Sequence, residues 1–336
     1  MAADSASIDP ANSASFSHPL RIVLPGGSGQ VGQALARLFQ QLGHHVTILT
    51  RGPYTAPWHT VHWDGLNPGP WVDALEGAEV VINLAGRSVN CRYTPANRRA
   101  IYDSRIGTTR LLNQVIAGLA NPPRVWLNAS TATIYRHALD REMDEATGEL
   151  GGSEPGAPSA WNFSIRVSKD WESAFFETPT PRTRKVALRS AITFSPAHGN
   201  PFAILSNLVR LSLGGSQGSG RQYVSWIHES DFARALLFLI QRDDFAGPVN
   251  LASPNPLPNR EFMADLREAW DVPNGIPAPR PLLELAALFL RTETELVLKS
   301  RRVVPGRLRA AGFQFEFPFW PHAAQDLVRQ WRQRYS

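Results

Sequence analysis

The chain has 336 residues, 43% of them hydrophobic, and its 34 basic side chains outnumber 29 acidic ones to give a net charge of +5. This length and composition exclude a wholly disordered or fibrous protein and predict a sizeable core with about two domains. No apolar run approaches the roughly 20 residues that a membrane span needs, so we expect a soluble protein without a membrane partner.

The N-terminal residues and the cysteine and histidine content exclude several kinds of signal and site and indicate the cellular compartment. Residues 1–19 are rich in Ala and Ser and contain no Lys or Arg, so they match neither a secretory signal nor a transit peptide and predict a disordered tail. Cys91 is the only cysteine, which excludes an internal disulfide and a cysteine-based metal site, and the histidines form no metal-ligand pattern. A cytoplasmic location fits this cysteine usage. The sequence leaves the oligomeric state open.

The positive charge comes almost entirely from arginine, because Lys169, Lys185 and Lys299 are the only lysines. Basic residues never form a run of five or six, so a nucleic-acid partner is not expected. Small polar or anionic molecules are the expected partners.

An apolar stretch over residues 20–25 breaks into a glycine-rich turn and predicts a strand, a tight turn and a helix. Gly26, Gly29 and Gly32 have the spacing at which the first glycine permits the turn, the second lets backbone approach a pyrophosphate, and the third lets the helix pack. A helix over 30–42 and a strand over 45–50 complete one βαβ unit. Glycines alone leave open a packing role without any ligand.

The end of the second predicted strand indicates which dinucleotide would bind. An NAD site usually has Asp or Glu there to hydrogen-bond the ribose 2′-hydroxyl. This chain has Thr50 and Arg51, and a hydroxyl beside a guanidinium suits a 2′-phosphate. The sequence therefore favours NADP(H) over NAD(H), with an ordinary surface arginine as the alternative.

Further strands are predicted over 60–63, 79–85 and 122–128. The first is followed by Asp64, the second ends in the turn Leu84–Gly86, and the third delivers residues 129–131 to the same edge. Ligands of open parallel sheets lie outside the carboxyl ends of the strands, so Asp64 and the Leu84–Gly86 turn should flank the cofactor.

In the rest of the chain, predicted helices and strands continue to alternate, and the last part is mainly helical. The predicted segments are a helix from Thr94 to about 119, a loop over 137–159, a helix over 162–176, a strand over 185–189, helices over 202–213 and 229–241, and a strand over 248–251. We expect an α/β fold with a Rossmann-like doubly wound parallel sheet. The predicted domains are an NAD(P)-binding domain over 20–255, with substrate-side insertions from about 190, and a smaller, mostly helical substrate-side domain over 256–336.

Several motifs in this order resemble the extended short-chain dehydrogenase/reductase superfamily, and most of all its branch of epimerase family proteins. The matching segments are 26–32, 46–51, 82–86, 103–108, 214–222 and 225–228, and 300–313 resembles the small domain that closes this branch. The resemblance runs from about residue 20 to 331. It implies an NAD(P)-dependent oxidoreductase or isomerase of the epimerase type.

The superfamily's chemistry implies a Tyr four residues before a Lys on one helix, with a Ser or Thr at the preceding strand end. Ser130 and Lys169 stand where this motif expects them, but Ile165 replaces the Tyr. The other lysines follow Pro181 and Glu295 at that spacing, so the chain contains no Tyr-x-x-x-Lys. An isoleucine cannot carry a proton. The resemblance implies that the branch commonly lacks this Tyr.

Tyr135 is the first candidate to replace the missing phenol, because it lies on the loop that in the superfamily brings a Tyr near the substrate. A phenol packed at the rim without a chemical role is the other interpretation, and Lys169 could be only a ribose ligand. Asp170, Glu172 and His228 are better explained as helix-surface or structural groups.

Two functions follow from these residues. The first is an NADP(H)-binding nucleoside-sugar epimerase or oxidoreductase of unknown substrate, and the second is a non-catalytic NADP(H)-binding regulatory or sensor protein. The catalytic candidates are Ser130, Tyr135 and Lys169. The predicted cofactor contacts are Gly26, Ser28, Gly29, Gln30, Val31, Gly32, Thr50, Arg51, Asp64, Leu84, Ala85, Gly86 and Lys169.

Overall fold

The computed structural model describes residues 16–154, 157–289 and 293–335. Its centre is a seven-stranded sheet in the order β10-β6-β5-β4-β1-β2-β3, and every pair of neighbours is parallel. The strands are β1 (Arg21–Pro25), β2 (His45–Thr50), β3 (His59–His62), β4 (Val80–Asn83), β5 (Val125–Thr131), β6 (Arg184–Ser190) and β10 (Gly247–Leu251). The chain starts at β1 in the middle and winds outward on both sides. The predicted doubly wound α/β fold is confirmed.

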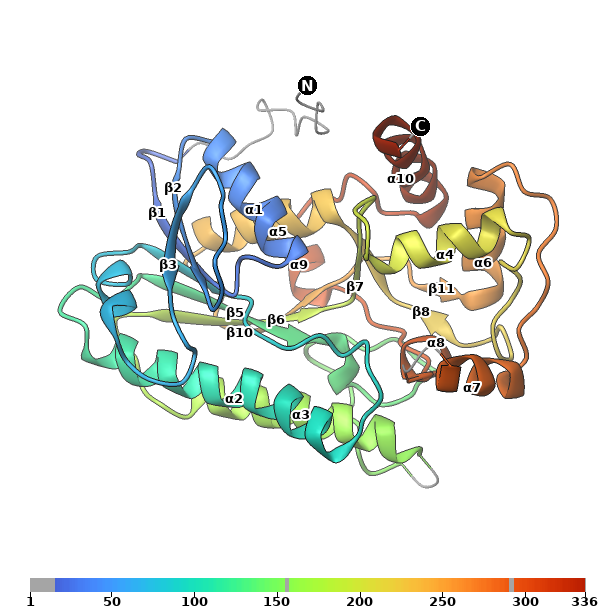
Figure 1. Cartoon of the computed structure of the whole chain (residues 1–336), viewed down its shortest axis with the longest axis horizontal. Coiled ribbons are helices and arrows are strands. Elements are labelled where there is room, and N and C mark those ends of the chain that lie inside the picture. Colours follow the sequence, from blue (N-terminus) through green and yellow to red (C-terminus); the bar gives the residue numbers. More distant parts are fainter. Residues whose placement is uncertain (1–15, 155–156, 290–292, 336) are drawn as a thin grey trace.

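Helices cover both faces of this sheet (Figure 1). One face packs on α1 (Gln30–Gln41) and α5 (Glu229–Gln241), and the other on α2 (Pro95–Gly118) and α3 (Ser159–Phe176). Because side chains alternate along a strand, Ile22 belongs to the first core and Val23 to the second. Strands buried on both faces need nearly continuous apolar runs, which is the pattern that the sequence has.

A second unit lies beyond the carboxyl ends of the strands, on the right in Figure 1. Two small sheets join β7 (Ile192–Phe194) to β9 (Trp226–His228) and β8 (Tyr223–Val224) to β11 (Leu257–Pro258). Its helices are α4 (Pro201–Arg210), α6 (Asn259–Ala269), α7 (Arg280–Phe289), α8 (Glu295–Leu298) and α10 (Trp320–Tyr335). Aromatic side chains such as Phe262 and Trp320, which stack with ring centroids 4.0 Å apart, form its core.

The short helix α9 (Gly306–Ala310) returns from the second unit to the large sheet. Its Leu308 is fully buried in the core that α1 and α5 share with the strands. Asp231 of α5 holds the following segment, since its carboxylate accepts the backbone N–H groups of Glu316 and Phe317, each at 2.8 Å. The C-terminal segment is therefore tied to both units.

Some predicted boundaries shift for local reasons. Helix α3 begins at Ser159, directly after Pro158, whereas the predicted helix began at 162. Helix α4 ends at Arg210, before the predicted end at 213, and Ser212 then takes a φ of 58°. Of the tail predicted over 1–19, residues 1–15 lie outside the described residues. His18 lies within the described part, and its Nε2 atom is 2.7 Å from a carboxylate oxygen of Glu79. Within the described segments, no helix combines the length and apolar character that a membrane crossing requires.

Candidate functional site

The glycine-rich turn connects β1 to α1 and touches the ends of two neighbouring strands. Gly26 has a φ of 73°, and a Cβ there would lie 2.6 Å from the Cα of Ala85, so only glycine fits. A Cβ on Gly32 would lie 2.4 Å from the Cα of Gly27, where the helix packs against the turn. At Gly29 the nearest atom to such a Cβ is the Gly26 oxygen, 3.8 Å away. Internal packing therefore explains Gly26 and Gly32 but not Gly29.

Helix α1 presents its N-terminus at this turn. Gly29 is the N-cap, no side chain caps the helix, and its first turn has no acidic residue. Free N–H groups and the helix dipole attract an anion at such an end. Around it lie Ser28 and Val31, both half-buried, and the exposed Gln30, whose side-chain amide donates to the backbone oxygen of His198.

The side chains expected at a ribose 2′-phosphate lie at the end of β2. The buried Thr50 hydroxyl donates to Ser28 Oγ at 3.3 Å, which connects the strand end to the glycine turn. Arg51 follows it on the surface, and among the described residues its guanidinium has no hydrogen-bond or ion-pair partner. This end of β2 therefore offers a hydroxyl and an accessible cation beside the helix N-terminus.

Asp64 follows β3, and its side chain is hydrogen-bonded to residues of the loop in which it lies. Its carboxylate accepts the backbone N–H groups of Asn67 at 2.9 Å and Leu66 at 2.7 Å, and the Asn67 side-chain amide at 2.9 Å. These hydrogen bonds lower the pKa of Asp64 to about 2. The carboxylate is therefore ionised and fixed in orientation at the surface.

The turn after β4 is fixed from both sides. The Leu84 N–H donates to Pro25 O at 2.8 Å, and the Ala85 N–H donates to Asn83 Oδ1 at 3.1 Å. The buried Asn83 amide also donates to Asn128 Oδ1 at 2.7 Å, which links β4 to β5. Gly86 follows with its backbone exposed. This turn closes the side of the site opposite β2.

Ser130 and Tyr135 are brought together, but inside a buried network. The Ser130 hydroxyl donates to Glu172 at 2.6 Å, and Glu172 forms a two-pronged ion pair with Arg189 at 2.8 and 2.7 Å. Arg189 donates to the Tyr135 hydroxyl at 2.9 Å, and that hydroxyl donates to Asn250 at 2.9 Å.

This network engages both candidate hydroxyls. Tyr135 is 1% exposed, and burial raises the pKa of its phenol. Ser130 is 6% exposed. Both hydroxyls therefore lie inside the network around Glu172 and not at an accessible surface.

Lys169 has a different environment. It is half-buried, and among the described contacts it has no hydrogen bond to Ser130 or Tyr135. A Cβ on Gly152 would lie 3.7 Å from Lys169 Nζ and 3.2 Å from Ile165 Cγ2, so the loop at Gly152 covers the buried isoleucine. Lys169 also lines a groove of about 450 Å³ with Arg98, Asn162, Arg166 and Asp170, among others. This groove makes Lys169 the catalytic candidate that a small molecule can reach.

Thr131 is a strand-end hydroxyl that the sequence did not single out. It is half-buried, and its Oγ1 accepts the Thr133 N–H at 3.2 Å. Side chains alternate across a strand, so Thr131 and Ser130 point to opposite faces. This alternation of side chains is the signal in the sequence that distinguishes the Ser130 hydroxyl from the adjacent Thr131 hydroxyl.

A charged cluster from the C-terminal segment was also missed. Lys299 Nζ donates to the backbone oxygen of Thr133 at 2.8 Å, and Arg301 pairs with Glu295 at 3.4 Å. Glu295 in turn accepts the hydroxyl of Ser164, the residue before Ile165, at 2.5 Å. All three charged side chains are buried. They lie against the turn after β5 although more than a hundred residues separate the segments, so no local pattern indicates the contact.

Burial lowers the pKa of Lys299 from its ordinary value of 10.5 to about 7, in surroundings that include Arg301, Glu295, Glu154 and His137. Above pH 7 the unfolded chain then binds more protons at this lysine than the folded protein does, so the free energy of unfolding should rise with pH. We expect wild type to gain up to about 1.4 kcal/mol per pH unit relative to Lys299→Met between about pH 7 and 10. Urea unfolding at pH 7 and 9 measures this. A difference between the two proteins that stays constant with pH would contradict the lowered pKa.

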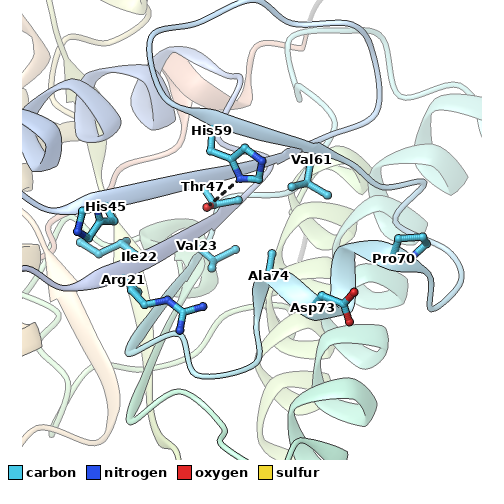
Figure 2. Close-up of a pocket in the computed structure, with 10 residues that line it drawn as sticks. All are labelled: Arg21, Ile22, Val23, His45, Thr47, His59, Val61, Pro70, Asp73 and Ala74. Carbon is cyan, nitrogen blue, oxygen red and sulfur yellow. Dashed lines mark hydrogen bonds between the residues drawn. The ribbon is translucent and has the colours of Figure 1, made fainter.

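Figure 2 shows another pocket, of about 370 Å³, on the face of β1, β2 and β3. Arg21, His45 and His59 line it, and each is the first residue of its strand. Pro70, Asp73 and Ala74, from the segment between β3 and β4, line its other side. The pocket therefore lies toward the amino ends of the strands, and none of the predicted site residues lines it.

Comparison with known proteins places this geometry in context. Residues 22–159 match the NAD dependent epimerase/dehydratase family, and residues 278–327 match a domain of unknown function, DUF1731. The chain is 30% identical to the human epimerase family protein SDR39U1, over 92% of this chain and 100% of the relative.

Solved structures agree with this match. The crystal structure of human SDR39U1 (isoform 2) with NADPH superposes with a TM-score of 0.80 at 28% identity, covering 92% of this chain and 99% of that one. A nucleoside-diphosphate sugar epimerase from Corynebacterium glutamicum gives 0.72 at 26% identity, covering 93% and 59%. MoeE5 in complex with UDP-glucose and NAD gives 0.69 at 19% identity, covering 94% and 99%, and shares the fold.

Proposed function

The chain belongs to the NAD dependent epimerase/dehydratase family, within the short-chain dehydrogenase/reductase superfamily, and from this premise we propose that it is an NADP(H)-dependent oxidoreductase or epimerase. The observation that carries the proposal is the unobstructed backbone at Gly29, where the uncapped N-terminus of α1 lies beside Thr50 and Arg51. The proposed substrate is a small polar or anionic molecule, such as a nucleoside sugar. The proposed location is the cytoplasm.

The residues present fit a nicotinamide dinucleotide. The first N–H groups of α1 would hold the pyrophosphate, Thr50 and Arg51 the 2′-phosphate, and Lys169 the nicotinamide ribose. When bound, the cofactor supplies hydride transfer. Asp64 and the Leu84–Gly86 turn would border it on either side.

The chain's own contribution to proton transfer is limited. Ile165 carries no proton, and the hydroxyls of Ser130 and Tyr135 are already committed within the Glu172 network. We therefore assign these two residues to holding the strand end, while Lys169 binds and orients. Any proton must come from another group, from water or from the substrate itself.

The buried Ile165, 1% exposed, favours a second candidate function, that of a non-catalytic NADP(H) sensor. Oxidation of NADPH in the presence of aldehydes, ketones and nucleotide sugars separates the two. Consumption of NADPH with any of them supports the enzyme. Binding of NADPH without consumption across the panel supports the sensor.

Arg51→Ala tests the cofactor choice. Loss of a charge-assisted hydrogen bond to the 2′-phosphate should weaken NADPH binding by roughly 1.5–3 kcal/mol, whereas the affinity for NADH, which lacks that phosphate, should change little. Isothermal titration of both cofactors into both proteins measures this. Equal losses for the two cofactors, or tighter binding of NADH by wild type, would overturn the preference for NADP(H).

A further inference from the structure

Arg105 projects from α2 to the turn after β4, where Gly86 is one of the predicted cofactor contacts. A Cβ on Gly86 would lie 3.2 Å from Arg105 Cζ and 3.4 Å from both terminal nitrogens, so the guanidinium lies close against the glycine. On its other side the guanidinium faces the ring of Trp171, with Cζ 5.2 Å from the ring centroid. The cation is held between the turn and α3.

The hydrogen bonds of Arg105 fix this position but use few of its donors. One terminal nitrogen, Nη1, donates to the backbone oxygens of Arg87 at 2.9 Å and Ile101 at 3.2 Å. Among the described contacts, Nε and Nη2 donate to nothing. These two nitrogens lie on one edge of the planar group and suit a carboxylate or phosphate.

Arg105 is half-buried, and two buried arginines of this region have carboxylate partners. Arg189 pairs with Glu172 at 2.7 Å, and Arg301 pairs with Glu295 at 3.4 Å. Arg105 has no carboxylate within ion-pair distance in the described parts of the chain, and burial lowers its pKa to about 10. A half-buried cation that lacks a carboxylate partner is only partly solvated, so an anionic partner from outside the chain would complete the site.

We propose that Arg105 binds an anionic oxygen group, a carboxylate or phosphate, of the substrate. This inference rests on the proposed function and specifies the substrate's chemistry. The cofactor's pyrophosphate has the same chemistry, but α1 approaches the sheet from the opposite face to α2 and α3 (Figure 1). Arg105 comes from α2, on the face of the sheet away from the α1 N-terminus that would hold the pyrophosphate, and we therefore assign its anion to the substrate.

The test titrates malonate and inorganic phosphate into protein saturated with NADPH and into free protein. Wild type should bind at least one of these anions, and Arg105→Met should bind it at least tenfold more weakly. Arg105→Lys should fall between the two, because it keeps the charge but loses the planar pair of donors. The matched control is Arg110→Met, which removes an exposed arginine of the same helix that pairs with Glu177. It should bind the anions as wild type does.

The NADPH and anion titrations together show which part of the proposal fails, if one does. NADPH affinity should change less than threefold in Arg105→Met. A tenfold loss of NADPH affinity would assign the anion to the cofactor and overturn the substrate assignment. Equal anion binding by wild type and Arg105→Met would overturn the site itself. If wild type bound no NADPH, the proposed function would fail, while the titration of free protein would still decide whether Arg105 binds anions. Circular dichroism confirms that each variant is folded.

Discussion

Gly29→Val should abolish binding of NADPH while leaving the protein folded. A Cβ at this position meets no atom closer than 3.8 Å, and the backbone angles, φ −72° and ψ 168°, are extended values that valine adopts readily. The branched side chain would instead occupy the space above the first N–H groups of α1. Because the pyrophosphate must reach those groups, we expect a loss of affinity of about 100-fold or more, which corresponds to about 2.8 kcal/mol.

The matched control is Gly32→Val, three residues further on, in the first turn of α1. There a Cβ would lie 2.4 Å from the Cα of Gly27, so this variant should lose stability as well as binding. Circular dichroism, thermal unfolding and cofactor titration are compared for both variants. Normal NADPH affinity in a folded Gly29→Val protein would mean that the glycines serve packing alone.

Glu172→Ala should lower the free energy of unfolding by about 3–5 kcal/mol. The variant leaves Arg189, 7% exposed, without its carboxylate, and Ser130 without the acceptor of its hydroxyl. An uncompensated buried charge is far more costly than a missing contact at the surface. Urea unfolding followed by circular dichroism measures the loss.

Glu177→Ala provides the comparison, because it breaks the ion pair with Arg110 at the surface, where the expected loss is about 0–1 kcal/mol. Replacing both buried partners, as Glu172→Leu with Arg189→Met, should recover part of the stability, since no charge then stays buried. Similar small losses for Glu172→Ala and Glu177→Ala would show that the buried pair contributes no more than the exposed one.

The elements that the sequence predicted well are those with strong local signals. Strand β2 and helix α5 begin and end at the predicted residues, since an apolar strand between turn residues and an amphipathic helix each have a distinct periodicity. The Thr94 side chain accepts the Asn97 N–H at 3.3 Å, which is the helix cap that the Thr-Pro pair predicts. The fold class follows from such segments in alternation.

The site could be predicted only in part, because its details depend on contacts between distant segments. Ser130 fits the motif by position, but its role depends on Glu172 of α3 and Arg189 of β6. Tyr135, which follows β5, is enclosed by Arg189 of the neighbouring strand β6 and Asn250 of the edge strand β10. Local spacing carries no information about such neighbours. The cofactor contacts stay predictions, although the geometry of the glycine turn supports them.

The return of α9 to the large sheet has a consequence for how the chain can be divided. The matched C-terminal segment, residues 278–327, includes Leu308, which fills the core beneath β10, and Glu316 and Phe317, which Asp231 of α5 anchors. A fragment ending before residue 278 would leave that part of the sheet's core open to water. The two units should therefore melt in a single cooperative transition, and neither is a module that recombination could exchange intact.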